Sequence, residues 1–238
     1  MHCYRIADLT VRYASAYTTL AARSLKYSCP ESDDALTLSV DPAQIEAFRP
    51  ISPGLNDDLR EYMLMGKAFY EKLIEFGGMM LHASAVVVDD RAYLFSAPSG
   101  TGKSTHTELW LRLFGTDAYI LNDDKPALRV VDGTLYAYGT PFSGKYDISE
   151  NRRVPLAGIA FIERSETNSI ARMAQNKAIY SLLNQTARPA SVSLYSVLLQ
   201  NLDRVLRLTP IYQLKCNMDI EAAHVAYETM RKGNCDED

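Results

Sequence analysis

The sequence has no long hydrophobic runs. Its longest apolar stretches, residues 83–88 and 158–162, have the length of single strands and fall far short of the roughly 20 residues that span a bilayer. The first residues include Arg5, Asp8 and Arg12 and lack an apolar signal core. We therefore expect a cytoplasmic protein that has no membrane partner.

A basic excess is also missing. The 238 residues include 25 Lys and Arg against 29 Asp and Glu, which gives a net charge of −4. A dedicated nucleic-acid-binding protein would need a basic excess or a concentrated basic stripe to neutralise phosphates. The charge balance argues against a nucleic-acid partner, but it still allows a local basic pocket. With 47% hydrophobic and 23% charged residues, the composition is that of an ordinary globular protein.

Cysteines are few and isolated. Cys3, Cys29, Cys216 and Cys235 form no Cys-x-x-Cys pair and have no histidine at zinc-binding spacing. We interpret them as unpaired thiols in a reducing compartment. A chain of this length buries about 70% of its unfolded surface, so its core needs neither a metal nor a disulfide.

Polar turns and prolines divide the chain into a short first part and a longer second part. The first part contains short β-rich runs at 6–13 and 36–40 and ends in a Pro-rich segment. We predict a small β-rich N-terminal module over residues 1–54 and one larger domain over residues 55–238.

Hydrophobic periodicity predicts the elements of the larger domain. Two apolar runs, 81–88 and 92–95, are separated by three polar residues and predict an antiparallel hairpin. Asp132-Gly133 predicts a second hairpin, between 127–131 and 134–138. We expect further strands at 119–121, 158–162, 169–174 (paired with 158–162) and 211–214, and helices at 56–74, 102–114, 176–184, 191–207 and 220–232.

Residues 97–104, Ala-Pro-Ser-Gly-Thr-Gly-Lys-Ser, match a phosphate-binding loop (P-loop) with alanine in place of the first glycine. Small residues let successive backbone N–H groups turn toward phosphate oxygens, and the following helix adds its positive N-terminal end. Lys103 would contact the β and γ phosphates, and the Ser104 hydroxyl would ligate Mg²⁺. A Gly-rich turn without a nucleotide is the alternative, but this segment lies between a predicted strand and a predicted helix. We predict that nucleotide is bound by Ser99, Gly100, Thr101, Gly102, Lys103, Ser104 and Thr105.

The loop alone names no reaction, because ATPases, GTPases and kinases all carry it. No Asn-Lys-x-Asp motif follows it, which disfavours a GTPase, and no lid of closely spaced arginines is found. In most P-loop proteins the loop follows a strand of a parallel sheet, whereas here the preceding strand belongs to a tight hairpin. We therefore predict an α/β fold whose mixed sheet has substantial antiparallel content.

Two adjacent carboxylates and one histidine complete the candidate site. Asp123 and Asp124 end a predicted strand, and adjacent acids repel each other unless a cation lies between them. One would bind Mg²⁺ and the other would accept a proton from an attacking hydroxyl; a solvated acidic turn is the alternative. His82 begins the first strand of the hairpin, whose pairing would bring it to the mouth of the loop. A core histidine is the alternative there.

Taken together, His82-Ala83-Ser84, the hairpin, residues 99–104 and Asp123-Asp124 resemble the catalytic domain of HPr kinase/phosphorylase and, more distantly, ATP-dependent phosphoenolpyruvate carboxykinase. Both families share an unusual P-loop fold with a mixed sheet. The resemblance covers about residues 81–128 well and continues more weakly to the C-terminus. Its nearest form is the short HPr-kinase-related proteins often found beside peptide-modification genes, through residues 140–145, 154–156, 183–186 and 216–218.

The resemblance implies a role for each site residue. Asp123 would be the base for the acceptor hydroxyl, and Asp124 would help Ser104 to hold the metal. Lys103 would stabilise the transferring phosphoryl group. His82 would lie beside Asp123 in a kinase and approach the metal in a carboxykinase.

Three further cations, Lys145, Arg152 and Arg153, lie in segments that would cover the phosphates or capture an acidic substrate, with ordinary surface charge as the alternative. The sequence also departs from the families. Ala97 replaces the first glycine of the loop, and Ala83 replaces the glycine that follows this histidine in HPr kinase. The loop linked with phosphorylase activity and the oxaloacetate-binding arginines are not recognisable.

The resulting hypothesis is a kinase that uses ATP and Mg²⁺ to phosphorylate a Ser or Thr hydroxyl of a protein or peptide. A carboxykinase-like lyase, a nucleotide-sensing regulator of a peptide-modifying complex and a plain ATPase are the alternatives. HPr kinases are hexamers, so the resemblance also implies a homo-oligomer, although no residue pattern marks a subunit interface.

Overall fold

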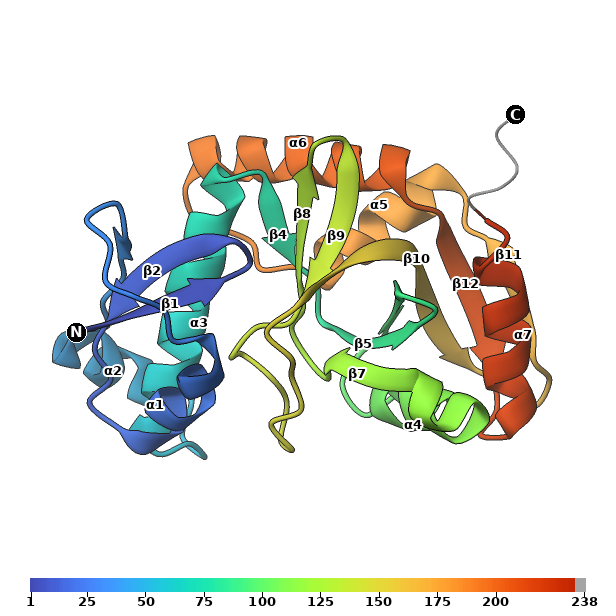
Figure 1. Ribbon diagram of the computed structural model, residues 1–238, viewed down its shortest axis with the longest axis horizontal. Helices are drawn as coiled ribbons and strands as arrows, with labels where there is room; N and C mark the ends of the chain where they lie inside the picture. Colours follow the sequence, from blue (N-terminus) through green and yellow to red (C-terminus); the bar gives the residue numbers. More distant parts are fainter. Residues whose placement is uncertain (234–238) are drawn as a thin grey trace.

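A long strand, β10 (Arg153–Arg164), runs through the centre of the molecule and joins the two halves of a nine-stranded sheet (Figure 1). This computed structural model describes residues 1–233. The other strands of the sheet are β4 (Gly78–Met80), β5 (Ala83–Val88), β6 (Arg91–Ser96), β7 (Ala118–Asn122), β8 (Ala127–Val131), β9 (Thr134–Tyr138), β11 (Ser169–Arg172) and β12 (Ile211–Cys216). β10 pairs antiparallel with β9 through its first residues, and parallel with β6 and β12 further along. The sheet is therefore mixed, as predicted.

Both predicted hairpins are present. β5 pairs antiparallel with β6, and β8 pairs antiparallel with β9. Asp89 and Asp90 in the first turn, and Asp132 and Gly133 in the second, have positive φ angles, which two-residue hairpin turns of the tightest kind require. The first hairpin places Ala83 opposite Ser96, so the start of β5 lies beside the end of β6.

One predicted pairing is wrong. We expected the strand near residues 169–174 to pair with the strand at 158–162, but β11 pairs with β12, and β12 lies between β11 and β10. The apolar pattern indicates that a strand forms, whereas its neighbour is decided by where a later segment of the chain inserts into the sheet.

Helices cover both faces of the sheet (Figure 1). They are α3 (Asp57–Glu75), α4 (Lys103–Phe114), α5 (Gln175–Asn184), α6 (Val192–Leu208) and α7 (Ile220–Met230), close to the five predicted ranges. α5 and α6 pack on one face and α4 and α7 on the other. Successive strand residues point to opposite faces, so Val87 faces α6 and Val86 faces α4. None of the helices within residues 1–233 is long and apolar enough to cross a membrane.

The first 54 residues are less β-rich than predicted. They form a small sheet of β1 (His2–Ile6), β2 (Leu9–Tyr13) and β3 (Leu36–Thr37), together with α1 (Thr18–Ser24), α2 (Pro42–Phe48) and one-turn 3₁₀ helices at Leu25–Tyr27 and Arg49–Ile51. The two α-helices were not predicted. α1 is short and its N-cap makes no side-chain hydrogen bond, whereas α2 carries a readable signal, the capping box of Asp41 and Gln44.

This N-terminal module packs against α3. Tyr13 and Leu20 of the module share a hydrophobic cluster with Phe69 of α3 and with Phe142, which lies between β9 and β10. Burying such side chains contributes roughly 1.5 to 3 kcal/mol each. The cluster therefore crosses the predicted boundary at residues 54 and 55, and the division into two domains stays a prediction.

Three of the four cysteines lie within the described residues. Cys3, Cys29 and Cys216 are free thiols. Cys235 lies outside the described residues.

Candidate functional site

One cleft of about 290 Å³ gathers most of the residues predicted to act. Its lining comes from the segment between β6 and α4, from residues at the end of β7 and from the loop between β9 and β10. Its lining residues are His82, Ser99, Gly100, Gly102, Lys103, Ser104, Thr105, Asp123, Asp124, Gly144, Lys145 and Tyr146. The fold thus brings the loop, both aspartates and the histidine into one place.

The predicted phosphate-binding loop has a backbone that requires glycine at two positions. Gly100 has φ +76° and Gly102 has φ +123°, while nothing lies within 4 Å of a Cβ built at either residue. The requirement is therefore conformational and not steric. Arg164 donates hydrogen bonds to the carbonyl oxygens of Gly100 (2.5 Å) and Thr101 (3.0 Å) from outside the loop. The N–H groups at the first turn of α4 have no acceptor within the helix and are available to an anion.

Lys103 begins α4 and is buried. Its Nζ donates a hydrogen bond of 2.9 Å to the carbonyl oxygen of Ala97, at the other end of the loop. Burial lowers the pKa of Lys103 and the charge of Lys125 lowers it further, while the carboxylate of Asp124 partly offsets both effects. Lys103 therefore lies across the loop, where its ammonium group feels the charge of Asp124.

Asp123 and Asp124 follow β7 and have different surroundings. Asp123 is buried, and its Oδ1 accepts a hydrogen bond of 2.6 Å from the backbone N–H of Gly144. Asp124 contacts two basic side chains, His82 through Oδ1 (3.2 Å) and Lys125 through Oδ2. Burial raises the pKa of Asp123; burial also acts to raise that of Asp124, but His82 and Lys125 outweigh it and lower the pKa to about 2. Asp123 is thus the carboxylate with the higher proton affinity.

From the sequence we expected His82 beside Asp123, but the structure places it beside Asp124. The carbonyl oxygen of Asp124 accepts a hydrogen bond of 3.0 Å from Ala83 N, so Asp124 continues the pairing with the start of β5, next to His82. A carboxylate oxygen and an amide oxygen both accept hydrogen bonds, so each ring nitrogen of His82 faces an acceptor. Its Nδ1 lies 2.9 Å from Oε1 of Gln185. Gln185 therefore orients the histidine, and the histidine contacts Asp124.

The loop between β9 and β10 is held by side chains of the N-terminal module and α3. Arg23 donates a hydrogen bond of 3.0 Å to the carbonyl oxygen of Ser143, and the Tyr62 hydroxyl donates one of 2.8 Å to the same atom. Lys26 donates one of 2.6 Å to the carbonyl oxygen of Ser149. These contacts place residue 144 against Asp123.

Several residues of this site were not predicted. A Cβ at Gly144 would lie 2.7 Å from Oδ2 of Asp123, so the close approach of the backbone depends on glycine. Gly144 and Gln185 lie in segments that carry the family resemblance, which is a usable signal. No sequence pattern marks Arg23, because its partners lie far along the chain.

Of the three cations expected near the phosphates, the structure brings one to the cleft. Lys145 lines it. The guanidinium of Arg152 lies over the ring of Tyr119, at 5.4 Å, and Arg153 forms an ion pair of 3.0 Å with Asp8. Both arginines lie where β10 begins, and the turn of the β1–β2 hairpin captures Arg153, so neither lines the cleft.

Two residues of the cleft suit a magnesium ion. Within residues 1–233, no group of three or more His, Cys, Asp and Glu side chains is arranged to hold a metal. Mg²⁺ usually takes one or two protein ligands and completes its shell with substrate phosphates and water. The Asp124 carboxylate and the Ser104 hydroxyl, which both line the cleft, supply oxygen ligands of this kind.

The chain was compared with known proteins at three levels. A scan against protein-family models found no match, and a search of curated proteins also found none. Among solved structures, the chain is similar to the Hpr(Ser) kinase/phosphatase from Coxiella burnetii, with a TM-score of 0.36 and 12% sequence identity over 65% of this chain and 98% of that one.

Proposed function

We propose that this protein is a kinase that transfers the γ-phosphoryl group of ATP, with Mg²⁺, to a Ser or Thr hydroxyl of a protein or peptide. The observation that carries the proposal is the meeting, in one cleft, of a glycine-dependent loop, Lys103 and two carboxylates with different surroundings. Phosphoryl transfer depends mainly on positioning and charge neutralisation, and these groups supply both.

The loop and α4 would bind the triphosphate. Backbone N–H groups of residues 99–105 would face its oxygens, and Lys103 would exchange its bond to Ala97 for the β and γ phosphates. Ser104 and Asp124 would hold Mg²⁺, which neutralises phosphate charge. Lys125 now contacts Asp124, and its side chain is 38% exposed, so it is free to turn away.

Asp123 would act as the general base. It takes the proton of the acceptor hydroxyl while the acceptor oxygen forms a bond to the γ phosphorus. The bond from that phosphorus to the bridging oxygen breaks, and its electron pair leaves with ADP. The N–H of Gly144 orients Asp123, and His82 orients Asp124. Lys145 would cover the phosphates from the neighbouring loop.

The acceptor in this proposal is a protein or a peptide. Three predictions from the sequence stay predictions: a homo-oligomer, a cytoplasmic location and the division into residues 1–54 and 55–238. A carboxykinase-like lyase, a plain ATPase and a non-catalytic nucleotide sensor are the rival functions.

The test is transfer from labelled ATP, with Mg²⁺, to peptides encoded by neighbouring genes, read by mass spectrometry. Asp123→Asn should keep ATP binding and lose about 10²- to 10⁴-fold in transfer, the range that general-base catalysis contributes. Lys103→Ala should lose both binding and transfer. Asp117→Asn, an exposed acid after α4 and outside the cleft, is the matched control and should behave as wild type.

The rival functions have distinct outcomes. Normal transfer by Asp123→Asn would refute the base assignment. Nucleotide-dependent release of CO₂ from oxaloacetate indicates a lyase, and hydrolysis that no acceptor changes indicates an ATPase. Tight nucleotide binding without any turnover indicates a sensor.

A further inference from the structure

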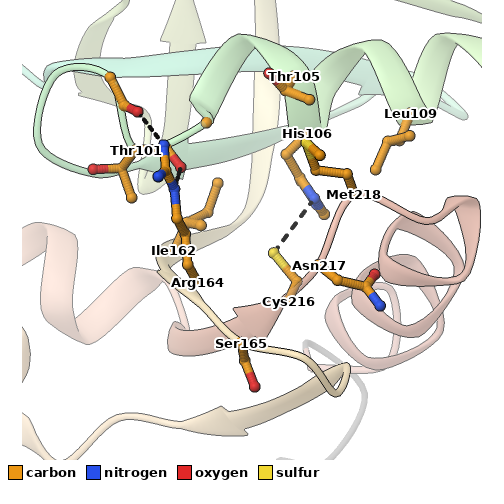
Figure 2. A pocket seen from close by; sticks show the side chains of 12 residues that line it. Thr101, Thr105, His106, Leu109, Ile162, Arg164, Ser165, Cys216, Asn217 and Met218 are labelled. Carbon is orange, nitrogen blue, oxygen red and sulfur yellow. Dashed lines mark hydrogen bonds between the residues drawn. The ribbon is translucent and has the colours of Figure 1, made fainter.

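A second cavity, of about 420 Å³, adjoins the phosphate-binding loop (Figure 2). It shares Gly100, Gly102 and Thr105 with the cleft that holds the aspartates, but neither aspartate lines it. The loop and α4 form one wall, and the ends of β10 and β12 form the other. We call it the β12 cavity.

We propose that the β12 cavity binds the base and ribose of a nucleoside triphosphate. The inference rests on the proposed function, because it assumes that the loop binds the triphosphate. A nucleoside is covalently joined to its phosphates, so it must lie in space that borders the loop. The β12 cavity borders the loop through three shared residues, and its volume lies within the range of small-ligand sites.

The surface of the β12 cavity suits a flat aromatic group. Leu109, Ile162 and Met218 line it with apolar atoms. At its floor, Cys216 and His106 are buried and lie against each other, with Sγ 4.0 Å from Nδ1 (Figure 2). Burial raises the pKa of the Cys216 thiol to about 11, so the thiol is uncharged. An aromatic base would gain apolar contact here, and the thioether of Met218 is well suited to contact a ring.

The polar side chains of the β12 cavity are largely engaged with the protein. Arg164 donates to the carbonyl oxygens of Gly100 and Thr101. The amide of Asn217 donates to Glu166 and Asp219 and accepts from the backbone of Asp219.

The hydroxyls of Thr101 and Thr105 also line the β12 cavity, and a hydroxyl both donates and accepts hydrogen bonds. Such groups do not distinguish the hydrogen-bonding edge of adenine from that of guanine. Recognition in the β12 cavity therefore works by shape and apolar contact, and ATP and GTP should bind with affinities within about tenfold of each other.

The experiment compares ATP with inorganic tripolyphosphate, both with Mg²⁺, by calorimetry on the full chain. Wild type should bind ATP at least about tenfold more tightly, because only ATP carries a group that fills the β12 cavity. Equal affinities overturn the inference and leave the proposed function standing. If neither ligand binds, both the proposed function and the inference fail.

A pair of variants localises the effect. Met218 is 76% exposed, so Met218→Ala should fold normally. It should weaken the binding of ATP by about fivefold and leave the affinity for tripolyphosphate unchanged. Ile220→Ala removes an exposed apolar side chain from the same segment but outside the β12 cavity, and should change neither affinity. The assignment is overturned if both variants weaken ATP binding equally. It is also overturned if Met218→Ala weakens the binding of ATP and of tripolyphosphate equally. A difference between ATP and GTP well beyond tenfold overturns recognition by shape alone.

Discussion

Two loops face Asp123 and Asp124, and they are held in different ways. The loop between β6 and α4 is shaped mainly by its own residues, through two glycines with positive φ and the helix that follows, and Arg164 adds one long-range support. The loop between β9 and β10 is shaped by contacts from far along the chain, through Arg23, Lys26 and Tyr62. The first loop is thus mostly a local structure, and the second depends on the N-terminal module and α3.

In the proposed kinase, we therefore expect changes around one loop to affect ATP binding and changes around the other to affect the rate of transfer. The first loop faces the phosphates, so changes in its support should weaken ATP binding. The second loop contacts Asp123 through Gly144, so changes in its support should slow transfer and leave ATP affinity unchanged. Four substitutions test this division, from the largest expected effect to the smallest.

Gly144→Ala should have the largest effect. The added Cβ would lie 2.7 Å from Oδ2 of Asp123, so either the loop or the carboxylate must move. Displacement of a catalytic group by about 1 Å costs on the order of 100-fold in rate. We expect that loss in kcat with an unchanged Kd for ATP. Gly54→Ala is the control, because nothing lies within 4 Å of a Cβ built there. A higher Kd for ATP in Gly144→Ala would show that the two loops do not have separate effects.

Arg23→Ala should slow transfer by about tenfold through the same loop, since a hydrogen bond to a charged group contributes about 1.5 to 3 kcal/mol. The substitution removes the bond to Ser143 and the ion pair of 3.7 Å with Asp147. Single-turnover rates and ATP affinity should be measured together. Arg23→Lys should recover part of the rate, and Arg5→Ala, elsewhere in the module, should change neither quantity. Equal losses for Arg23→Ala and Arg5→Ala would show that the contact with the loop has no role.

Arg164→Ala tests the other loop. It removes the donors that hold the carbonyl oxygens of Gly100 and Thr101. We expect ATP to bind about fivefold more weakly while kcat at saturating ATP stays the same, because about 1 kcal/mol of loop ordering is lost. Arg112→Ala, an exposed arginine on α4, is the control. A fall in kcat without a change in affinity would contradict the division between the loops.

Tyr62→Phe should have the smallest effect. It removes one hydroxyl that donates to the carbonyl oxygens of Ser143 and Pro141 and accepts from Arg23, but Arg23 still donates to the same oxygen of Ser143. Because the bond from Arg23 to the loop is kept, the loss of this neutral hydroxyl should reduce kcat by about threefold and leave the Kd for ATP unchanged. Tyr180→Phe, on a side chain that is 70% exposed, should leave kcat at the wild-type value. A loss as large as that of Arg23→Ala would mean that Tyr62, and not Arg23, is the main support of the loop.

Much of the fold was predictable because its signals are local. The hairpin turns at Asp89-Asp90 and Asp132-Gly133 and the cap of α3 at Asn56 each involve residues close together in the chain. The same holds for the loop that precedes α4. The pairing of β11 was predicted wrongly, because its neighbour β12 comes from a later part of the chain.

The sequence by itself determined where the glycine-dependent loop forms, which strand and helix flank it, and that two carboxylates follow a nearby strand. Those features depend on backbone conformation and on contacts between near neighbours. Only the tertiary structure decided that His82 contacts Asp124, that Arg153 contacts Asp8 and not the cleft, and that Gly144 contacts Asp123. Each of these contacts joins residues from separate elements, so the packing of the sheet and the N-terminal module sets them.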